Sequence, residues 1–125
     1  MLYVCRLDIA LYSCVTKNIA TDEVVITEKQ IQHILERHPG DYERFAAYLP
    51  SIIKTPDFIL EANKPNTSVV LKEIVYNESV IKTILRLATS ADNANYKNSI
   101  ITFMKIDKQD WNRLLRNKIV LYKRE

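Results

Sequence analysis

Two histidines, five positions apart, are the first residues in this sequence whose type could do chemistry. His33 and His38 lie in ITEKQIQHILERHPGDYERF, residues 26–45, and the chain contains no other histidine. Imidazole can transfer protons near neutral pH and can also bind metal ions. On a helix, residues five apart diverge by roughly 140°, so this pair does not share one face as zinc ligands on a helix do. The sequence therefore predicts no metal site and no cofactor.

His38 is the histidine for which we expect a role as general acid or base. In helical projection it falls between Ile34 and Leu35 on the apolar stripe, at the C-terminal end of the expected helix. The helix macrodipole favours the imidazolium there, which suits a group that gives up a proton near neutral pH. The alternative is a partly buried histidine that bonds a terminal carbonyl. His33 lies nearly opposite, so we expect it at the surface and keep it as the second candidate.

Two cations inside apolar segments are the other candidates. Lys72 lies in VVLKEIV and Arg86 in TILRLAT. They share a sheet face if the turn at Asn77-Glu78-Ser79 has an odd number of residues, whereas a two-residue turn puts them on opposite faces. The turn lacks the glycine that tight hairpin turns prefer, which favours the odd loop. Together with His38 the cations would form a pocket for a phosphodiester and its developing charge; alternatively, each simply faces water.

These side chains must be positioned by a single domain, residues 1–125. The chain is 47% hydrophobic and 26% charged, which is enough apolar material for one core. No run of about 18 apolar residues is present, so we expect a cytoplasmic protein with no membrane partner. A single glycine excludes a glycine-rich phosphate loop or dinucleotide-binding motif.

The basic charge is concentrated at the C-terminal end. Residues 97–125 contain eight lysines and arginines and three acidic residues, a net of +5, whereas the whole chain carries +3. The remaining 96 residues are therefore mildly acidic, at −2. A basic flank of this kind attracts phosphates at short range, although charged faces also serve only to keep a domain soluble.

Hydrophobic periodicity predicts the N-terminal elements. Alternating apolar residues indicate a strand over 7–11 and a shorter one over 23–26. Thr27 and Gln30 have the spacing of a capping box, so a helix is expected to begin there and to end at Pro39-Gly40.

The rest of the chain changes from helix to strands. The expected elements are a second helical stretch from residue 41 that Pro50 kinks or restarts, strands in 58–62, 68–76, 80–89 and 99–106, a helix over 107–117 and a final strand in 118–123. Adjacent strands with short polar turns favour an antiparallel meander. The predicted fold class is α+β: N-terminal helices packed on an antiparallel sheet of four or more strands, with a C-terminal helix and short strand.

Four stretches in this order resemble the phage-associated branch of the barnase, EndoU, colicin and RelE-like nuclease superfamily. They are VVITEKQIQHILERHPGDYERF, PDFILEANKPNTSVVLKEI, ILRLATS followed by YKNSIITFMKI, and WNRLLRNKIVLYK. The resemblance implies a metal-independent endoribonuclease in which a ribose 2′-hydroxyl attacks the adjacent phosphate. The implied partner is RNA, including tRNA. A further possible partner is an acidic immunity or antitoxin protein that pairs with the Lys and Arg faces.

Transferred onto this sequence, the resemblance also implies site residues. They are His38 as general acid or base with His33 as second candidate, Lys72 and Arg86 as phosphate and transition-state stabilisers, and Ser99 or Thr102 as the hydroxyl of the last core strand. The competing hypothesis is a non-catalytic nucleic-acid-binding or protein-binding module with a phage structural or accessory role. The two differ in turnover, because only a nuclease loses cleavage when His38 becomes Ala while binding survives.

Overall fold

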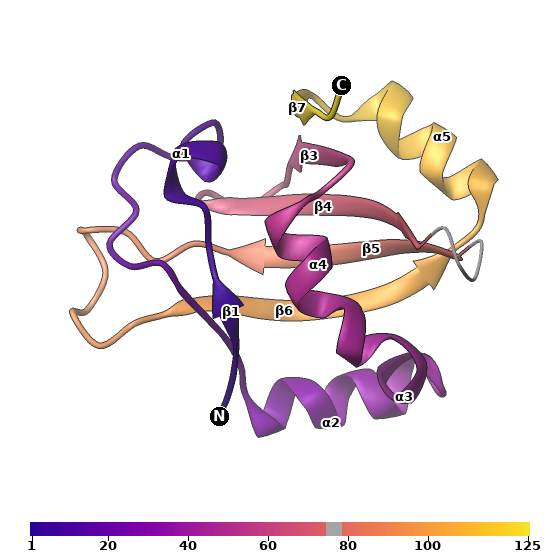
Figure 1. Ribbon diagram of the computed structural model, residues 1–125, viewed down its shortest axis with the longest axis horizontal. Helices are drawn as coiled ribbons and strands as arrows, with labels where there is room; N and C mark the ends of the chain where they lie inside the picture. Colours follow the sequence, from indigo (N-terminus) through magenta and orange to yellow (C-terminus); the bar gives the residue numbers. More distant parts are fainter. Residues whose placement is uncertain (75–78) are drawn as a thin grey trace.

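The protein is a seven-stranded sheet with helices packed on it. The computed structural model describes residues 1–74 and 79–125. Its strands are β1 (Leu2–Arg6), β2 (Glu23–Ile26), β3 (Phe58–Glu61), β4 (Thr67–Ile74), β5 (Ser79–Arg86), β6 (Asn98–Ile106) and β7 (Val120–Lys123). Its helices are α1 (Ile9–Tyr12), α2 (Glu28–Arg37), α3 (Asp41–Phe45), the 3-10 turn η1 (Ala46–Tyr48), α4 (Leu49–Lys54) and α5 (Lys108–Asn117) (Figure 1). The predicted α+β class is confirmed.

The strand order is β1-β2-β6-β5-β4-β3-β7. Strands β3 to β6 form the expected antiparallel meander, since each pairs with the next along the chain. Strand β2 joins this meander through a parallel pairing with β6, in which Val24 lies opposite Asn98. The meander is thus the centre of the sheet, and the N-terminal strands extend it on the β6 side.

One predicted strand is wrong. The alternation over residues 7–11 suggested a strand, but β1 ends at Arg6 and α1 begins at Ile9. The Asp8 side chain accepts a hydrogen bond from the backbone N–H of Leu11 at 3.1 Å, which caps a helical turn at this point. Local capping therefore overrides a short period-two pattern.

The helix starts predicted from sequence are confirmed. Thr27 and Gln30 form a reciprocal capping box at the start of α2, with backbone-to-side-chain distances of 3.0 and 3.1 Å. Pro50 lies in the first turn of α4, so it restarts a helix rather than kinking one. No helix of the described residues is long and apolar enough to cross a bilayer.

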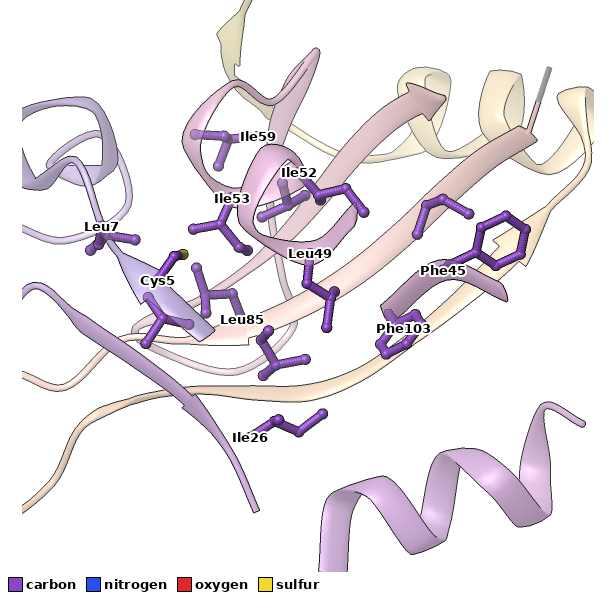
Figure 2. Close-up of a cluster of buried hydrophobic side chains, with 14 of the residues drawn as sticks. Cys5, Leu7, Ile26, Phe45, Leu49, Ile52, Ile53, Ile59, Leu85 and Phe103 are labelled. Carbon is purple, nitrogen blue, oxygen red and sulfur yellow. The ribbon is translucent and has the colours of Figure 1, made fainter. Parts of the chain in front are cut away.

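The main core lies between the N-terminal helices and one face of the sheet. Helix α4 contributes Leu49, Ile52 and Ile53, all nearly or fully buried. Figure 2 shows these side chains gathered with Leu85 and Phe103 of the sheet. We call this side of the sheet the helix face.

The other side of the sheet is only partly covered. Helix α5 packs Trp111 edge-on against Phe58, with ring centroids 5.6 Å apart and an interplanar angle of 81°. Trp111 and Val80 belong to a second, smaller apolar cluster, to which Ile84 also packs. We call this side the open face, because α5 leaves its other end uncovered.

Candidate functional site

The register of β4 and β5 decides where the two candidate cations point. Lys72 lies opposite Ile81, and Arg86 lies opposite Thr67. Opposed residues of an antiparallel pair share a face, and successive residues alternate between faces. Lys72 therefore projects from the helix face with Ile81, whereas Arg86 projects from the open face. The predicted shared face is wrong.

The turn between these strands was the basis of that prediction. Its residues Asn77 and Glu78 lie outside the part of the chain that the structure describes. The flanking register is described, and Ile74 lies opposite Ser79. Residues 75–78 separate these two positions, which is an even number. The prediction of a shared face required an odd number.

Lys72 has a structural position at the end of α4. Its Nζ donates to the backbone carbonyl of Thr55 at 2.5 Å and to Thr55 Oγ1 at 3.1 Å. Thr55 is the C-terminal cap of α4, where carbonyl groups lack partners within the helix. Burial lowers the pKa of Lys72, and the nearby Arg124 acts in the same direction. Lys72 anchors a helix to the sheet.

His38 lies at the far end of β6 from Arg86. The backbone N–H of Asp41 donates to the carbonyl of His38 at 3.1 Å, and Asp41 Oδ2 accepts from the backbone N–H of Lys105 at 3.0 Å. Arg86 lies opposite Ser99 on the same strand. At about 3.3 Å per residue, Ser99 and Lys105 are roughly 20 Å apart. The expected meeting of His38, Lys72 and Arg86 in one pocket is therefore wrong.

The uncovered end of the open face forms a cleft of about 590 Å³ around Arg86. Its floor is apolar and includes Val69 and Ile84, and its rim carries Lys64 and Lys118. A cationic rim over an apolar floor suits a ligand with a phosphate and a flat organic part.

Lys82 is the residue of this cleft that sequence reasoning missed. It precedes Arg86 by four residues on β5 and lies opposite Leu71, so both cations share the open face. Desolvation lowers the pKa of the half-buried Lys82 ammonium, and the neighbouring Lys118 lowers it further. The alternation of faces within VIKTILR could have placed Lys82 and Arg86 on the same face, because this inference uses one strand and does not depend on a turn.

Lys118 closes one side of the cleft. Its Nζ donates to Asn63 Oδ1 at 2.9 Å, which connects the segment after α5 to the loop after β3. The contact holds a second ammonium group beside Lys82 and fixes the width of the cleft at this point.

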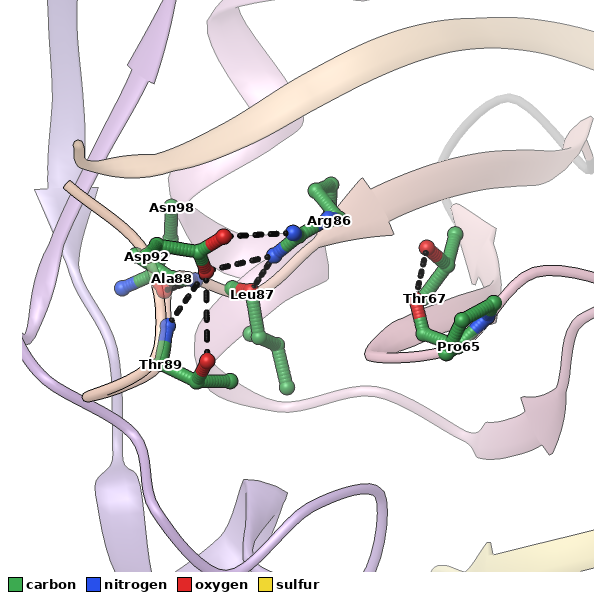
Figure 3. A network of polar contacts seen from close by, with 8 residues as sticks. All are labelled: Pro65, Thr67, Arg86, Leu87, Ala88, Thr89, Asp92 and Asn98. Atoms are coloured by element: carbon green, nitrogen blue, oxygen red, sulfur yellow. Dashed lines mark hydrogen bonds and ion pairs between the residues drawn. The ribbon is translucent and has the colours of Figure 1, made fainter.

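Arg86 is held by a carboxylate, as Figure 3 shows. Its guanidinium donates to both oxygens of Asp92, at 2.9 and 3.1 Å, and also to the carbonyl of Leu87. Asp92 in turn accepts from the N–H and hydroxyl of Thr89, at 2.8 and 3.2 Å. The hydrogen bond from Arg86 lowers the pKa of Asp92 to about 2, helped by the bond from Thr89. The guanidinium therefore has a fixed orientation.

The two hydroxyl candidates lie on the same face as Arg86. Ser99 is opposite Arg86, and its Oγ is 3.1 Å from Gln30 Nε2, so α2 orients it. Thr102 is opposite Ile84, next to a bulge in β6, and its buried Oγ1 has no partner among the described residues. His33 is exposed on α2, as expected. No three His, Cys, Asp or Glu side chains of the described chain gather as a metal-binding group.

Comparison with family models identifies the chain. Residues 9–123 match the model described as phage-Barnase-EndoU-ColicinE5/D-RelE like nuclease2. The chain belongs to this family. A search of curated proteins and a search of solved structures gave no match. Membership of this nuclease family rests on nearly the whole domain and indicates a hydrolase.

Proposed function

We propose that this nuclease-family domain is a metal-independent endoribonuclease whose active site is the open-face cleft around Lys82 and Arg86. One observation carries the proposal: two cations on one face of β5 occupy the same cleft, one partly desolvated and one fixed by a carboxylate. This arrangement replaces the pocket expected from His38 and Lys72.

Arg86 supplies the phosphate contact in this proposal. A guanidinium has five N–H donors, and the bonds to Asp92 and Leu87 engage three of them. The two that remain are free of these bonds and can donate to the non-bridging oxygens of a phosphodiester. A donor held in place before the reaction stabilises developing charge without reorganisation.

Lys82 accepts the first proton, and Lys118 is the neighbouring cation that helps to keep Lys82 neutral. The neutral amine of Lys82 accepts the proton of the ribose 2′-hydroxyl as its oxygen attacks phosphorus. The bond from phosphorus to the 5′ oxygen breaks, and a solvent proton goes to that oxygen, because the leaving oxygen lies in line with and opposite to the attacking one, away from Lys82. The products are a 2′,3′-cyclic phosphate end and a free 5′-hydroxyl. Desolvation favours the neutral form that Lys82 needs.

The experiment is incubation of the purified chain with tRNA and with mixed RNA in EDTA. We expect discrete fragments with cyclic phosphate ends. Lys82→Ala and Arg86→Ala should lose cleavage, while Lys105→Ala should keep it. Lys105 is a matched control, because it is an exposed lysine opposite Ile81 and so belongs to the helix face.

Two outcomes would refute the proposal. One is inertness of a folded chain toward every RNA, which together with retained RNA binding would favour a non-catalytic binding module. The other is cleavage that persists in both cleft variants, because the reaction would then take place elsewhere on the domain.

A further inference from the structure

We propose that a second hollow beside Arg86 binds the base of an unpaired nucleotide, with Tyr96 as the stacking surface. The inference rests on the proposed ribonuclease function, because it assigns a subsite next to the same phosphate-binding arginine. It also specifies the substrate: single-stranded rather than duplex RNA.

The second hollow adjoins the first at Arg86. Its volume is about 440 Å³, and Arg86 is the residue that lines both. The walls of the second hollow include Val25, Tyr96 and Ser99. A phosphodiester has one nucleoside on each side, so a phosphate on Arg86 would direct one nucleoside toward Lys82 and the other toward Tyr96.

Tyr96 is exposed, yet its segment is fixed. The residue is 58% exposed, and its backbone N–H donates to the carbonyl of Asn93 at 2.9 Å. Asn98 anchors the segment to two other parts of the chain. Its side chain accepts a hydrogen bond from the backbone N–H of Ala88 at 2.8 Å and donates one to the Thr21 carbonyl at 2.7 Å. An aromatic ring on an ordered segment loses little conformational freedom when a base stacks on it.

The charges of the second hollow favour a base over a second phosphate. Its lysine, Lys97, is paired with Glu23 at 3.1 Å. The Ser99 hydroxyl is bonded to Gln30. The Met1 ammonium is paired with Glu28 at 2.6 Å. With these groups engaged, the hollow offers mainly a ring and the exposed amide of Asn95, which are the groups that stack on a base and hydrogen-bond its edge.

The test measures binding of a 2′-fluoro RNA oligonucleotide, which lacks the 2′-hydroxyl and so cannot be cleaved by the proposed reaction. Fluorescence anisotropy gives its affinity as a single strand and after annealing to its complement. We expect Tyr96→Leu to weaken single-strand binding by about tenfold, the order expected for one lost stacked base. Tyr96→Phe should bind like the parent, because the ring remains. Leu35→Ala removes exposed apolar surface on α2 outside both hollows and should have no effect.

The outcomes separate this inference from the proposed function. If Tyr96→Leu binds as tightly as the parent, or if the duplex binds as tightly as the single strand, the base subsite is overturned even where RNA is cleaved. If the parent cleaves no RNA but its single-strand binding depends on the Tyr96 ring, the ribonuclease proposal fails and the subsite stands.

Discussion

The same substitution at two lysines of neighbouring strands tests where the active site lies. Lys72 and Lys82 lie on β4 and β5 but project from opposite faces, since Lys82 is opposite Leu71. Methionine keeps most of the unbranched side chain of lysine and removes the charge. We expect Lys72→Met to lower stability and to leave cleavage unchanged. We expect Lys82→Met to lower the cleavage rate without lowering stability.

The size of the Lys72 effect follows from two opposing contributions. Losing the ammonium leaves the Thr55 carbonyl without its donor, which costs about 1–3 kcal/mol for a buried group and less at a partly exposed one. Removing a partly desolvated charge, whose pKa burial lowers, recovers part of that cost. The net loss of unfolding free energy should be about 1 kcal/mol, or a fall in Tm of roughly 4 °C for a domain of this size.

The Lys82 effect should appear in the rate. Removing a general base lowers kcat by about 10²–10⁴-fold. Thermal unfolding followed by circular dichroism and steady-state RNA cleavage at saturating substrate measure the two quantities on both variants. Loss of cleavage in a folded Lys72→Met variant, or normal kcat in Lys82→Met, would refute the placement of the site on the open face.

Three further predictions concern His38 and titration. His38→Ala should retain cleavage within about twofold, because His38 lies near Lys105, roughly 20 Å along β6 from the residue opposite Arg86, and a large loss of kcat would return it to the mechanism. The cleavage rate should rise with pH and level off below the ordinary lysine value of 10.5, since the pKa of Lys82 is lowered; a rise that continues past that value would contradict a desolvated base. The pKa of Asp92 falls from 3.8 to about 2 on folding, so its contribution to stability is full above the higher value and disappears as pH falls through the lower. Denaturant titrations between these pH values should show that Asp92→Asn loses less unfolding free energy on acidification than the parent. An equal loss in both proteins would show that Asp92 does not contribute.

Patterns that depend on one element alone were predicted well. The capping box at Thr27 located the start of α2, and β-branched runs located the meander. The strand predicted over residues 7–11 failed because Asp8 caps a helical turn, a contact that competes with a pattern only five residues long.

The site was predicted less well, because it depends on relations between elements. Whether Lys72 and Arg86 share a face changes with one residue in the turn between their strands. The position of α5 decides which part of the open face is left as a cleft, and nothing in the amphipathic pattern of that helix tells which end of the sheet it covers. Arg86 was identified from its apolar context, whereas Lys82 and Asp92 gain significance only once the face is known.

The parallel pairing of β2 with β6 sets an order for folding on the ribosome. Val24 emerges early but pairs with Asn98, which is translated 74 positions later. Until then the N-terminal strands lack the neighbour that attaches them to the sheet, and the capped helix α2 can form before its sheet contacts exist. Such distant pairings slow folding and leave strand edges open to wrong partners. We therefore expect nascent chains that end before residue 98 to be protease-sensitive over residues 1–26, and chains long enough for all of β6 to have left the ribosome to be protected.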